Sequence, residues 1–159
     1  MKKIVLMLIL LNTNCIFSQI DCSKTERKID EFTEQVYINS PLINRGGMSN
    51  MVIYKIIEKT RTVYSIHLNA TGNTINFNIK GVIVIFDDGT KWTSDDRVEC
   101  DYDDGHYNYS TYLTLTEEDV IVFSTKKISK YRLYIYDKEI KEKEAERFRE
   151  NVECVINTQ

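Results

Sequence analysis

The stretch from Gly81 to Trp92, GVIVIFDDGTKW, constrains the fold of this chain more than any other part of the sequence. Its apolar run from Val82 to Phe86 is rich in β-branched residues, which favour strands. The Asp88-Gly89 pair that follows supplies the positive φ of a tight hairpin turn before a return strand. A strand that is apolar on both faces needs cover on both, so we expect this one in the middle of a layered β-structure.

The first 18 residues have the three parts of a secretory signal peptide. Two lysines precede an apolar run of about eight residues, which is too short to span a bilayer, and Ser18 offers a small residue for cleavage. We expect cleavage after Ser18 and an exported protein that is periplasmic, on the cell surface or secreted. We disfavour the alternative, a lipoprotein anchored at Cys15, because residues 12–14 lack the small apolar residues of such signals.

The composition of the mature chain limits its partners. Loss of residues 1–18 reduces the 21 basic side chains to 19 against 24 acidic ones, a net charge of −5. This balance argues against nucleic acid and anionic membranes as partners. Residues 19–159 contain one proline, no repeat and no later run of transmembrane length, so we expect a single β-rich globular domain. The oligomeric state stays open.

Three cysteines survive the expected cleavage. Cys100 alternates with charged residues along 97–103 and is interpreted as a small buried hydrophobic residue. Cys22 and Cys154 lie near the two ends of the mature chain, and domain termini are often close together. We therefore predict a disulfide between Cys22 and Cys154 in an oxidising compartment.

Alternating or continuous apolar segments predict strands along most of the chain. After a polar lead-in over 22–34, we expect them at 35–43, 50–58, 61–69, 74–80, 82–86, 97–103, 107–115 and 128–136. In the segment 74–80, we expect Ile75, Phe77 and Ile79 to face inward. The fold class is mainly β with a C-terminal helix: an antiparallel β-sandwich or flattened barrel of seven to nine strands.

Two segments predict helices. Thr116 is followed by three acids and then an apolar run, which indicates a short capped helix near 117–124. Asp137 can cap a longer helix near 139–153, which would pack on one face or across one end of the sheets. Its narrow apolar stripe contains Ile140, Ala145, Phe148 and Val152.

The order of several motifs resembles a group of small exported proteins from Bacteroidota. The motifs are KGVIVIFDDGTKW, a tyrosine-rich strand entering LTEEDVIVF, TKKISKYRLYIYD, and a charged helix that ends in a cysteine. The resemblance covers roughly residues 30–156. It implies an envelope or secreted setting and carries no activity, so no site residue is transferred.

Acidic residues gather between Asp87 and Asp104. Asp101, Asp103 and Asp104 resemble the start of a calcium loop, but the later ligands of such a loop are missing. We favour the interpretation that these aspartates serve turns, because their side chains bond the local backbone. We expect no metal and no cofactor.

Catalytic groups are scarce. The two histidines, His67 and His106, are expected on the surface, and no serine near them sits in a nucleophile motif. Two histidines and three separated cysteines do not make a zinc site. We therefore expect no enzyme activity, and keep as an alternative a small secreted hydrolase that uses acidic residues of the 87–104 region.

Aromatic residues are the remaining feature, with ten tyrosines and one tryptophan. Four of them are candidate binding residues for a glycan or a protein, because exposed aromatic rings suit sugars and peptides: Trp92, Tyr112, Tyr134 and Tyr136. The competing interpretation, which we favour, is that they pack beneath a covering layer. Lys126, Lys127, Lys130 and Arg132 form a basic stripe that could dock an anion or simply be a solvated strand face.

The sequence thus favours an exported, non-catalytic protein that binds a glycan or a protein partner in the cell envelope. The hydrolase is one alternative. Another is an inhibitor or immunity-like accessory protein, which the sequence does not distinguish from the favoured binding protein.

Overall fold

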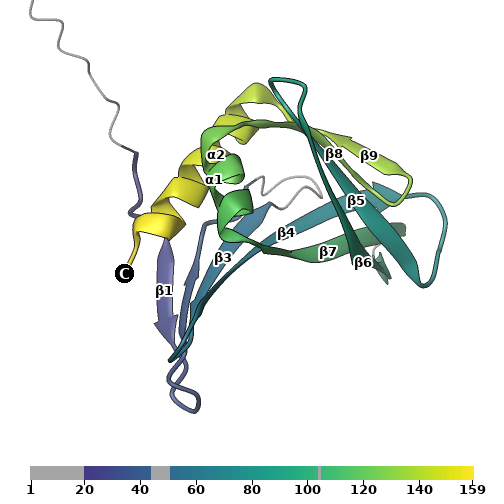
Figure 1. The fold of residues 1–159 in the computed structure, drawn as a ribbon. Helices are drawn as coiled ribbons and strands as arrows, with labels where there is room; N and C mark the ends of the chain where they lie inside the picture. Colours follow the sequence, from purple (N-terminus) through teal and green to yellow (C-terminus); the bar gives the residue numbers. More distant parts are fainter. Residues whose placement is uncertain (1–19, 44–50, 104) are drawn as a thin grey trace, which may run out of the picture.

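The computed structural model describes residues 20–43, 51–103 and 105–159 (Figure 1). Within these ranges the chain forms nine strands and two helices. The strands are β1 (Glu26–Ile29), β2 (Val36–Asn39), β3 (Val52–Ile57), β4 (Thr62–Gly72), β5 (Ile79–Phe86), β6 (Lys91–Asp103), β7 (His106–Leu115), β8 (Ile128–Leu133) and β9 (Tyr136–Glu139). The helices are α1 (Glu117–Thr125) and α2 (Glu142–Asn157). The predicted signal peptide and the Cys15 alternative lie outside the described residues.

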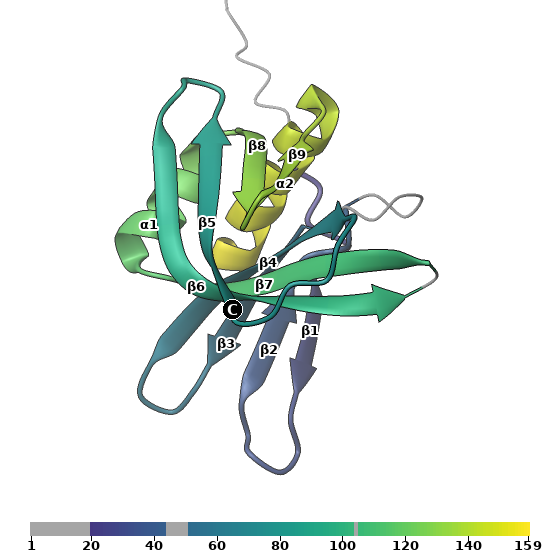
Figure 2. The ribbon, with the colours of Figure 1, turned by 90° about the vertical axis from the view of Figure 1, so that its right-hand side faces the viewer.

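The described strands form one antiparallel sheet in the order β1-β2-β3-β4-β7-β6-β5-β8-β9, which does not close into a barrel. The predicted mainly β, antiparallel fold with a C-terminal helix is therefore confirmed. Strand β6 joins two halves of this sheet: residues 91–98 pair with β5, and residues 99–103 pair with β7. Figure 2 shows β6 curving from the small half (β5, β8, β9) into the large half (β1, β2, β3, β4, β7).

The inner faces of the two halves enclose the core. Val84 and Phe86 of β5, and Ile66 and Leu68 of β4, are at most 2% exposed. The hydroxyl of Tyr131 in β8 donates a hydrogen bond to the carbonyl of Asn69 in β4, which ties one half to the other. Burial of these alternate side chains supplies the main stabilisation of the fold.

Helix α1 closes one side of the small half, as Figure 1 shows. Thr116 and Asp119 form a capping box, which confirms the predicted start of this helix. Phe123 of α1 then packs with its ring centroid 5.3 Å from that of Phe86 and 5.4 Å from that of Trp92.

Helix α2 packs on the inner face of β3 and against α1. Its buried stripe includes Ala145, Phe148 and Val152. Lys55 of β3, only 8% exposed, donates hydrogen bonds to the carbonyls of Ile156 (2.9 Å) and Thr158 (2.7 Å). A cation therefore satisfies the carbonyl end of α2, where the helix dipole favours positive charge.

Several predicted boundaries were wrong. The lead-in over 22–34 contains β1, and the C-terminal helix begins at Glu142 rather than Glu139, with Ile140 buried ahead of it. The predicted strand at 128–136 is a hairpin of β8 and β9, which turns at Tyr134 with a φ of 59°.

The predicted strand over 74–80 was also wrong, because β5 begins only at Ile79. Phe77 is 74% exposed and Ile75 48% exposed, and only Ile79 faces inward. The backbone of Thr74 bonds tyrosine hydroxyls instead of a neighbouring strand: its N–H donates to Tyr136, and its carbonyl accepts from Tyr109. These contacts hold the segment out of the sheet.

Strand β5 lies in the interior of the sheet order, between β6 and β8, as expected. Its outer side chains, however, are not fully covered, because Ile83 and Ile85 are only half-buried. The expectation of cover on both faces was therefore wrong.

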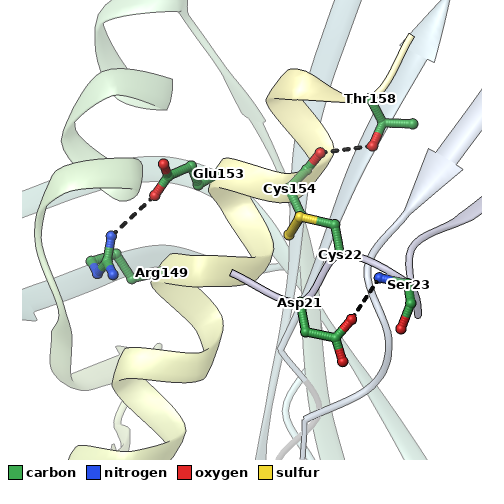
Figure 3. Close-up of a disulfide and its surroundings, with 7 residues drawn as sticks. All are labelled: Asp21, Cys22, Ser23, Arg149, Glu153, Cys154 and Thr158. Atoms are coloured by element: carbon green, nitrogen blue, oxygen red, sulfur yellow. Dashed lines mark hydrogen bonds and ion pairs between the residues drawn. A yellow bond between two sulfur atoms is a disulfide. The ribbon is translucent and has the colours of Figure 1, made fainter. Parts of the chain in front are cut away.

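The predicted disulfide between Cys22 and Cys154 is present (Figure 3), with 5.3 Å between the two Cα atoms. It fixes the exposed N-terminal segment to the buried side of α2. Cys100 is a free thiol that is half-buried rather than fully buried, and it packs against the core from β6.

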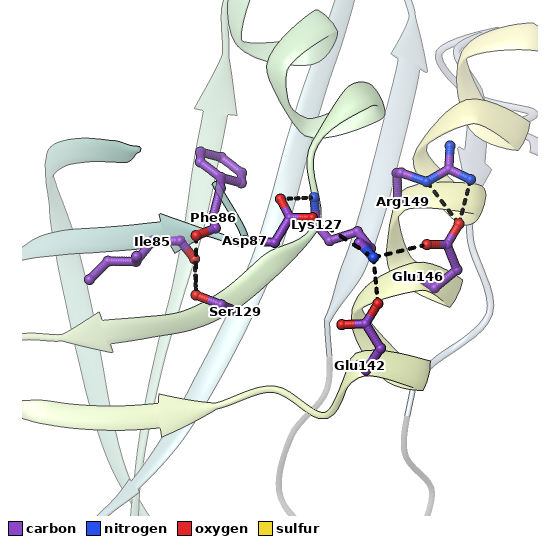
Figure 4. A network of polar contacts seen from close by, with 8 residues as sticks. All are labelled: Ile85, Phe86, Asp87, Lys127, Ser129, Glu142, Glu146 and Arg149. Carbon is purple, nitrogen blue, oxygen red and sulfur yellow. Dashed lines mark hydrogen bonds and ion pairs between the residues drawn. The ribbon is translucent and has the colours of Figure 1, made fainter. Parts of the chain in front are cut away.

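A network of charged side chains holds α2 against the small half (Figure 4). Lys127, just before β8, pairs with Glu142, and its Nζ lies 3.8 Å from carboxylate oxygens of both Asp87 and Glu146. Arg149 donates to Glu146 at 2.6 Å. Part of the predicted basic stripe therefore serves the packing of α2.

We predict that the double variant Cys22→Ser/Cys154→Ser has a free energy of unfolding lower by about 2–5 kcal/mol, because the disulfide closes a long loop in the unfolded chain. Urea denaturation followed by circular dichroism measures this difference. Cys100→Ser, which removes no covalent link, is the control and should change the midpoint much less. Equal midpoints for the double variant and the parent protein would contradict the prediction.

Candidate functional site

The four candidate aromatic residues lie in different places: one on the outer face, one in a turn and two against the core. Tyr112 is 60% exposed on the outer face of the large half, and Tyr134 is 37% exposed in the turn between β8 and β9. Trp92 and Tyr136 are half-buried and pack against the core. Trp92 and Tyr136 therefore follow the packing interpretation.

Trp92 is built into the start of α1. Its Nε1–H donates to the carboxylate of Asp119 at 2.6 Å, and its ring packs edge-on against Phe123. The same carboxylate accepts from the backbone N–H of Thr116 at 3.0 Å. The indole and its polar edge are thus both engaged in joining α1 to the small half.

Tyr136 is engaged inside the sheet in a similar way. Its ring centroid lies 4.6 Å from that of Tyr109, and its hydroxyl bonds Thr74 Oγ1 at 2.7 Å. Gly72 of β4 is needed here, because a Cβ at this position would lie 2.3 Å from the ring of Tyr109 and 2.6 Å from that of Tyr136. These contacts join β4 and β7 of the large half to β9 of the small half.

The outer face of the large half carries an aromatic cluster around Tyr112. The ring of His67 in β4 lies 4.6 Å from that of Tyr112 in β7, and the ring of Tyr54 in β3 lies 6.1 Å from it. We call Tyr54, His67 and Tyr112 the aromatic face. The three rings come together because β4 lies between β3 and β7, and each ring stands on an outward-facing position of its strand.

Small polar side chains surround the aromatic face. Ser65 is paired with Tyr54 and Thr114 across neighbouring strands, and Ser110 lies next to Tyr112 on the outer side of β7. Burial lowers the pKa of His67 from its ordinary value, so this imidazole is neutral at neutral pH. The rings of the aromatic face and the hydroxyl groups beside them therefore carry no formal charge at neutral pH, and Glu99 of β6 lies next to Ser110 at their edge.

The sequence identified Tyr112 but missed Tyr54 and His67. His67 was predicted to be a solvated surface residue; it faces outward as expected, yet it is half-buried beneath Tyr112. His106 is exposed at the first position of β7. The alternation of outer and inner residues in 61–69 indicated that His67 faces outward. It could not show that Tyr112 packs on His67, because the sequence did not reveal that β7 is the neighbouring strand.

Three acids of the 87–104 region, Asp87, Asp88 and Asp96, serve local structure. Asp88 accepts from the N–H of Thr90 at 2.9 Å and pairs with Lys126 at 2.7 Å, and these contacts lower the pKa of its carboxyl. Asp96 accepts from Ser94 at 2.6 Å. Each of these carboxylates has a partner in its own turn, its own strand or an adjoining loop, as a structural role requires.

Only one of the three residues of the calcium alternative has a described side chain. Asp101 is exposed on β6, whereas the side chains of Asp103 and Asp104 are not among those described. Among the described side chains, no three of histidine, cysteine, aspartate or glutamate are placed to hold a metal ion.

Hollows lie at three places on the described part of the chain. One, about 850 Å³, lies between α2 and the segment near Pro41, and side chains of both charge signs line it, including Lys24, Asp21, Arg147 and Glu150. Another, about 230 Å³, lies between residues 76–78 and residues 97–101 of β6. A third, about 210 Å³, lies over Ile83 and Ile85 on the outer face of the small half. Within the described residues, neither helix has the length and apolar character needed to cross a membrane.

Comparisons with protein-family models, with curated proteins and with solved structures gave no match. The case for a function therefore rests on the residues of this chain.

We predict that Asp119→Asn lowers the free energy of unfolding at pH 7 by about 0.5–1.5 kcal/mol, through the weakened bonds to Trp92 and Thr116. Burial opposes ionisation of Asp119, but the bonds from Thr116 and Trp92 outweigh it and lower its pKa. The carboxylate's stabilisation is therefore present above its unfolded pKa, near 3.9, and is lost as pH falls through the lower folded value.

The fluorescence of Trp92, the single tryptophan, reports this unfolding directly. Urea titrations at pH 7 and at pH 3 should show the stability difference between parent and Asp119→Asn shrinking at the lower pH. A difference that stays constant across this range would mean that the carboxylate does not stabilise the start of α1.

Proposed function

We propose that this protein is an exported, non-catalytic binding protein whose aromatic face binds a glycan. The observation that carries the proposal is the exposure of Tyr112. Strand β7 has a neighbour on each side, yet this ring is 60% exposed with the ring of His67 packed against it. A large ring held in place and left open to solvent in the middle of a sheet favours a binding surface over a packing role.

The chemistry of the aromatic face favours a sugar over a protein partner. Sugar rings have apolar C–H faces and a rim of hydroxyl groups, so they match an aromatic ring beside hydroxyl-bearing side chains. Ser65, Ser110 and Thr114 provide such hydroxyls next to Tyr54 and Tyr112. Protein interfaces are richer in arginine and in a closed apolar centre, which the aromatic face lacks.

The absence of catalysis is part of the proposal. A hydrolase that used the 87–104 acids would need two carboxylates facing each other across a cleft. Asp87, Asp88 and Asp96 instead contact Lys127, Lys126 and Ser94 respectively. These pairings give the three carboxylates structural roles and disfavour the hydrolase alternative for them.

Export is proposed on three grounds. The signal-like residues 1–18 and the resemblance to exported Bacteroidota proteins motivate it, and a disulfide between Cys22 and Cys154 is compatible with an oxidising compartment. A periplasmic or cell-surface location would bring the aromatic face into contact with envelope glycans.

We predict that Tyr112→Ala weakens glycan binding by about 3- to 10-fold, because one stacked ring contributes on the order of 1 kcal/mol. A glycan array probed with residues 19–159 identifies a ligand, and calorimetry then compares the variant with the parent. Tyr134→Ala is the matched control, since this tyrosine is exposed but lies in the β8–β9 turn, and it should bind as the parent does.

Two outcomes contradict the proposal. One is equal affinity of the parent and Tyr112→Ala for a glycan found on the array. The other is no glycan binding together with capture of an envelope protein that depends on Tyr112, which would favour the inhibitor or accessory role.

A further inference from the structure

The hollow over Ile83 and Ile85, on the outer face of the small half, combines an apolar floor with a rim that is mostly cationic. Lys91 of β6 and Lys130 and Arg132 of β8 form the cationic part of the rim. Asp137 of β9 also lines it, and this carboxylate is paired with Arg132, so the two lysines carry the unpaired charge. We call the two isoleucines and the three cations the cationic hollow, and none of them belongs to the aromatic face.

The strand register brings two lysines to opposite sides of one isoleucine. Ile85 is paired with Lys91 on β6 and with Lys130 on β8. Neighbouring strands are about 4.8 Å apart, so the two lysine Cα atoms lie roughly 10 Å apart across Ile85. Lysine side chains are long enough for both ammonium groups to reach a single anion above this residue.

Two carboxylates of β9 lie near these lysines. Asp137 accepts from Arg132 at 2.8 Å, and Lys130 also helps to lower the pKa of that carboxyl. Glu139 is the cross-strand partner of Lys130. Within the described part of the chain, neither Lys91 nor Lys130 forms an ion pair. Lys126 and Lys127, the other members of the predicted basic stripe, are instead paired with Asp88 and Glu142.

The size of the cationic hollow limits its ligand. A volume of about 210 Å³ is below the usual range for drug-sized ligands, which begins near 300 Å³. A compact apolar group of a few carbon atoms fits over Ile83 and Ile85, and a carboxylate fits between the lysines. The chain as a whole has more acidic than basic side chains, so most of its surface repels anions. The positive charge of the lysines attracts an anion to this place.

We propose that the cationic hollow is a second binding site, which takes a small carboxylate with a compact apolar body. The apolar body lies on Ile83 and Ile85, and the carboxylate lies between Lys91 and Lys130. The site is independent of the proposed glycan binding, because it lies on the other half of the sheet and shares no residue with the aromatic face.

Hexanoate is the probe that tests this site, and isoleucine methyl signals in NMR titrations are the readout. We expect saturable shifts of the Ile83 and Ile85 methyl groups, with a dissociation constant in the millimolar range, as for other small fragments. Hexan-1-ol, hexylammonium and inorganic phosphate each lack the carboxylate or the apolar body, and should bind at least about tenfold more weakly.

The variant Lys91→Gln/Lys130→Gln removes both charges at exposed positions and should weaken hexanoate binding about tenfold or more. Lys80→Gln, an exposed lysine of β5 outside the hollow, is the matched control and should bind as the parent does. An unchanged Trp92 fluorescence spectrum confirms that each variant is folded.

The proposal is overturned if hexanoate causes no saturable shift at Ile83 and Ile85, or if the double variant binds it as the parent does. Equal binding of hexan-1-ol or of inorganic phosphate would also overturn it, because either the charge or the apolar body would then be irrelevant.

Discussion

The alternation of inner and outer side chains along β6 is the constraint on which the rest of the structure depends. This strand pairs with β5 over its first part and with β7 over its last part. Its even-numbered residues, from Trp92 to Cys100, are buried or half-buried, whereas the odd-numbered ones from Lys91 to Asp101 are exposed. One continuous strand therefore gives both halves the same inside and the same outside.

Both helices cover the sheet from the inside. Helix α1 contacts Phe86 and Trp92, and α2 is held by Lys55, by the Lys127 network and by the disulfide. The outer faces of the two halves stay open within the described residues and differ in chemistry. The large half presents rings and hydroxyl groups, and the small half presents isoleucines between cations, so we propose one uncharged and one anionic ligand.

Local signals predicted the parts of the fold that depend on neighbouring residues. Asp88-Gly89 marked the hairpin, and Thr116 with Asp119 marked the start of α1. The disulfide followed from the position of its cysteines near the chain ends. The segment near Thr74 could not be predicted, because tyrosine hydroxyls from β7 and β9 bind its backbone. Prediction of the aromatic face and the cationic hollow likewise required knowledge of the strand order. Lys91 and Lys130, for example, come together only because their strands lie on either side of β5.

Cysteine labelling along β6 tests the continuous alternation most directly. Single cysteines are introduced at exposed Thr93, Arg97 and Glu99 and at covered Ser94 and Val98, in a Cys100→Ser background without reductant, which leaves the disulfide intact. We predict fast labelling with a polar thiol reagent at 93, 97 and 99, and slow labelling at 94 and 98. Faster labelling at 94 or 98 than at 97 and 99 would contradict the account, because the two halves would then not share one inside and one outside.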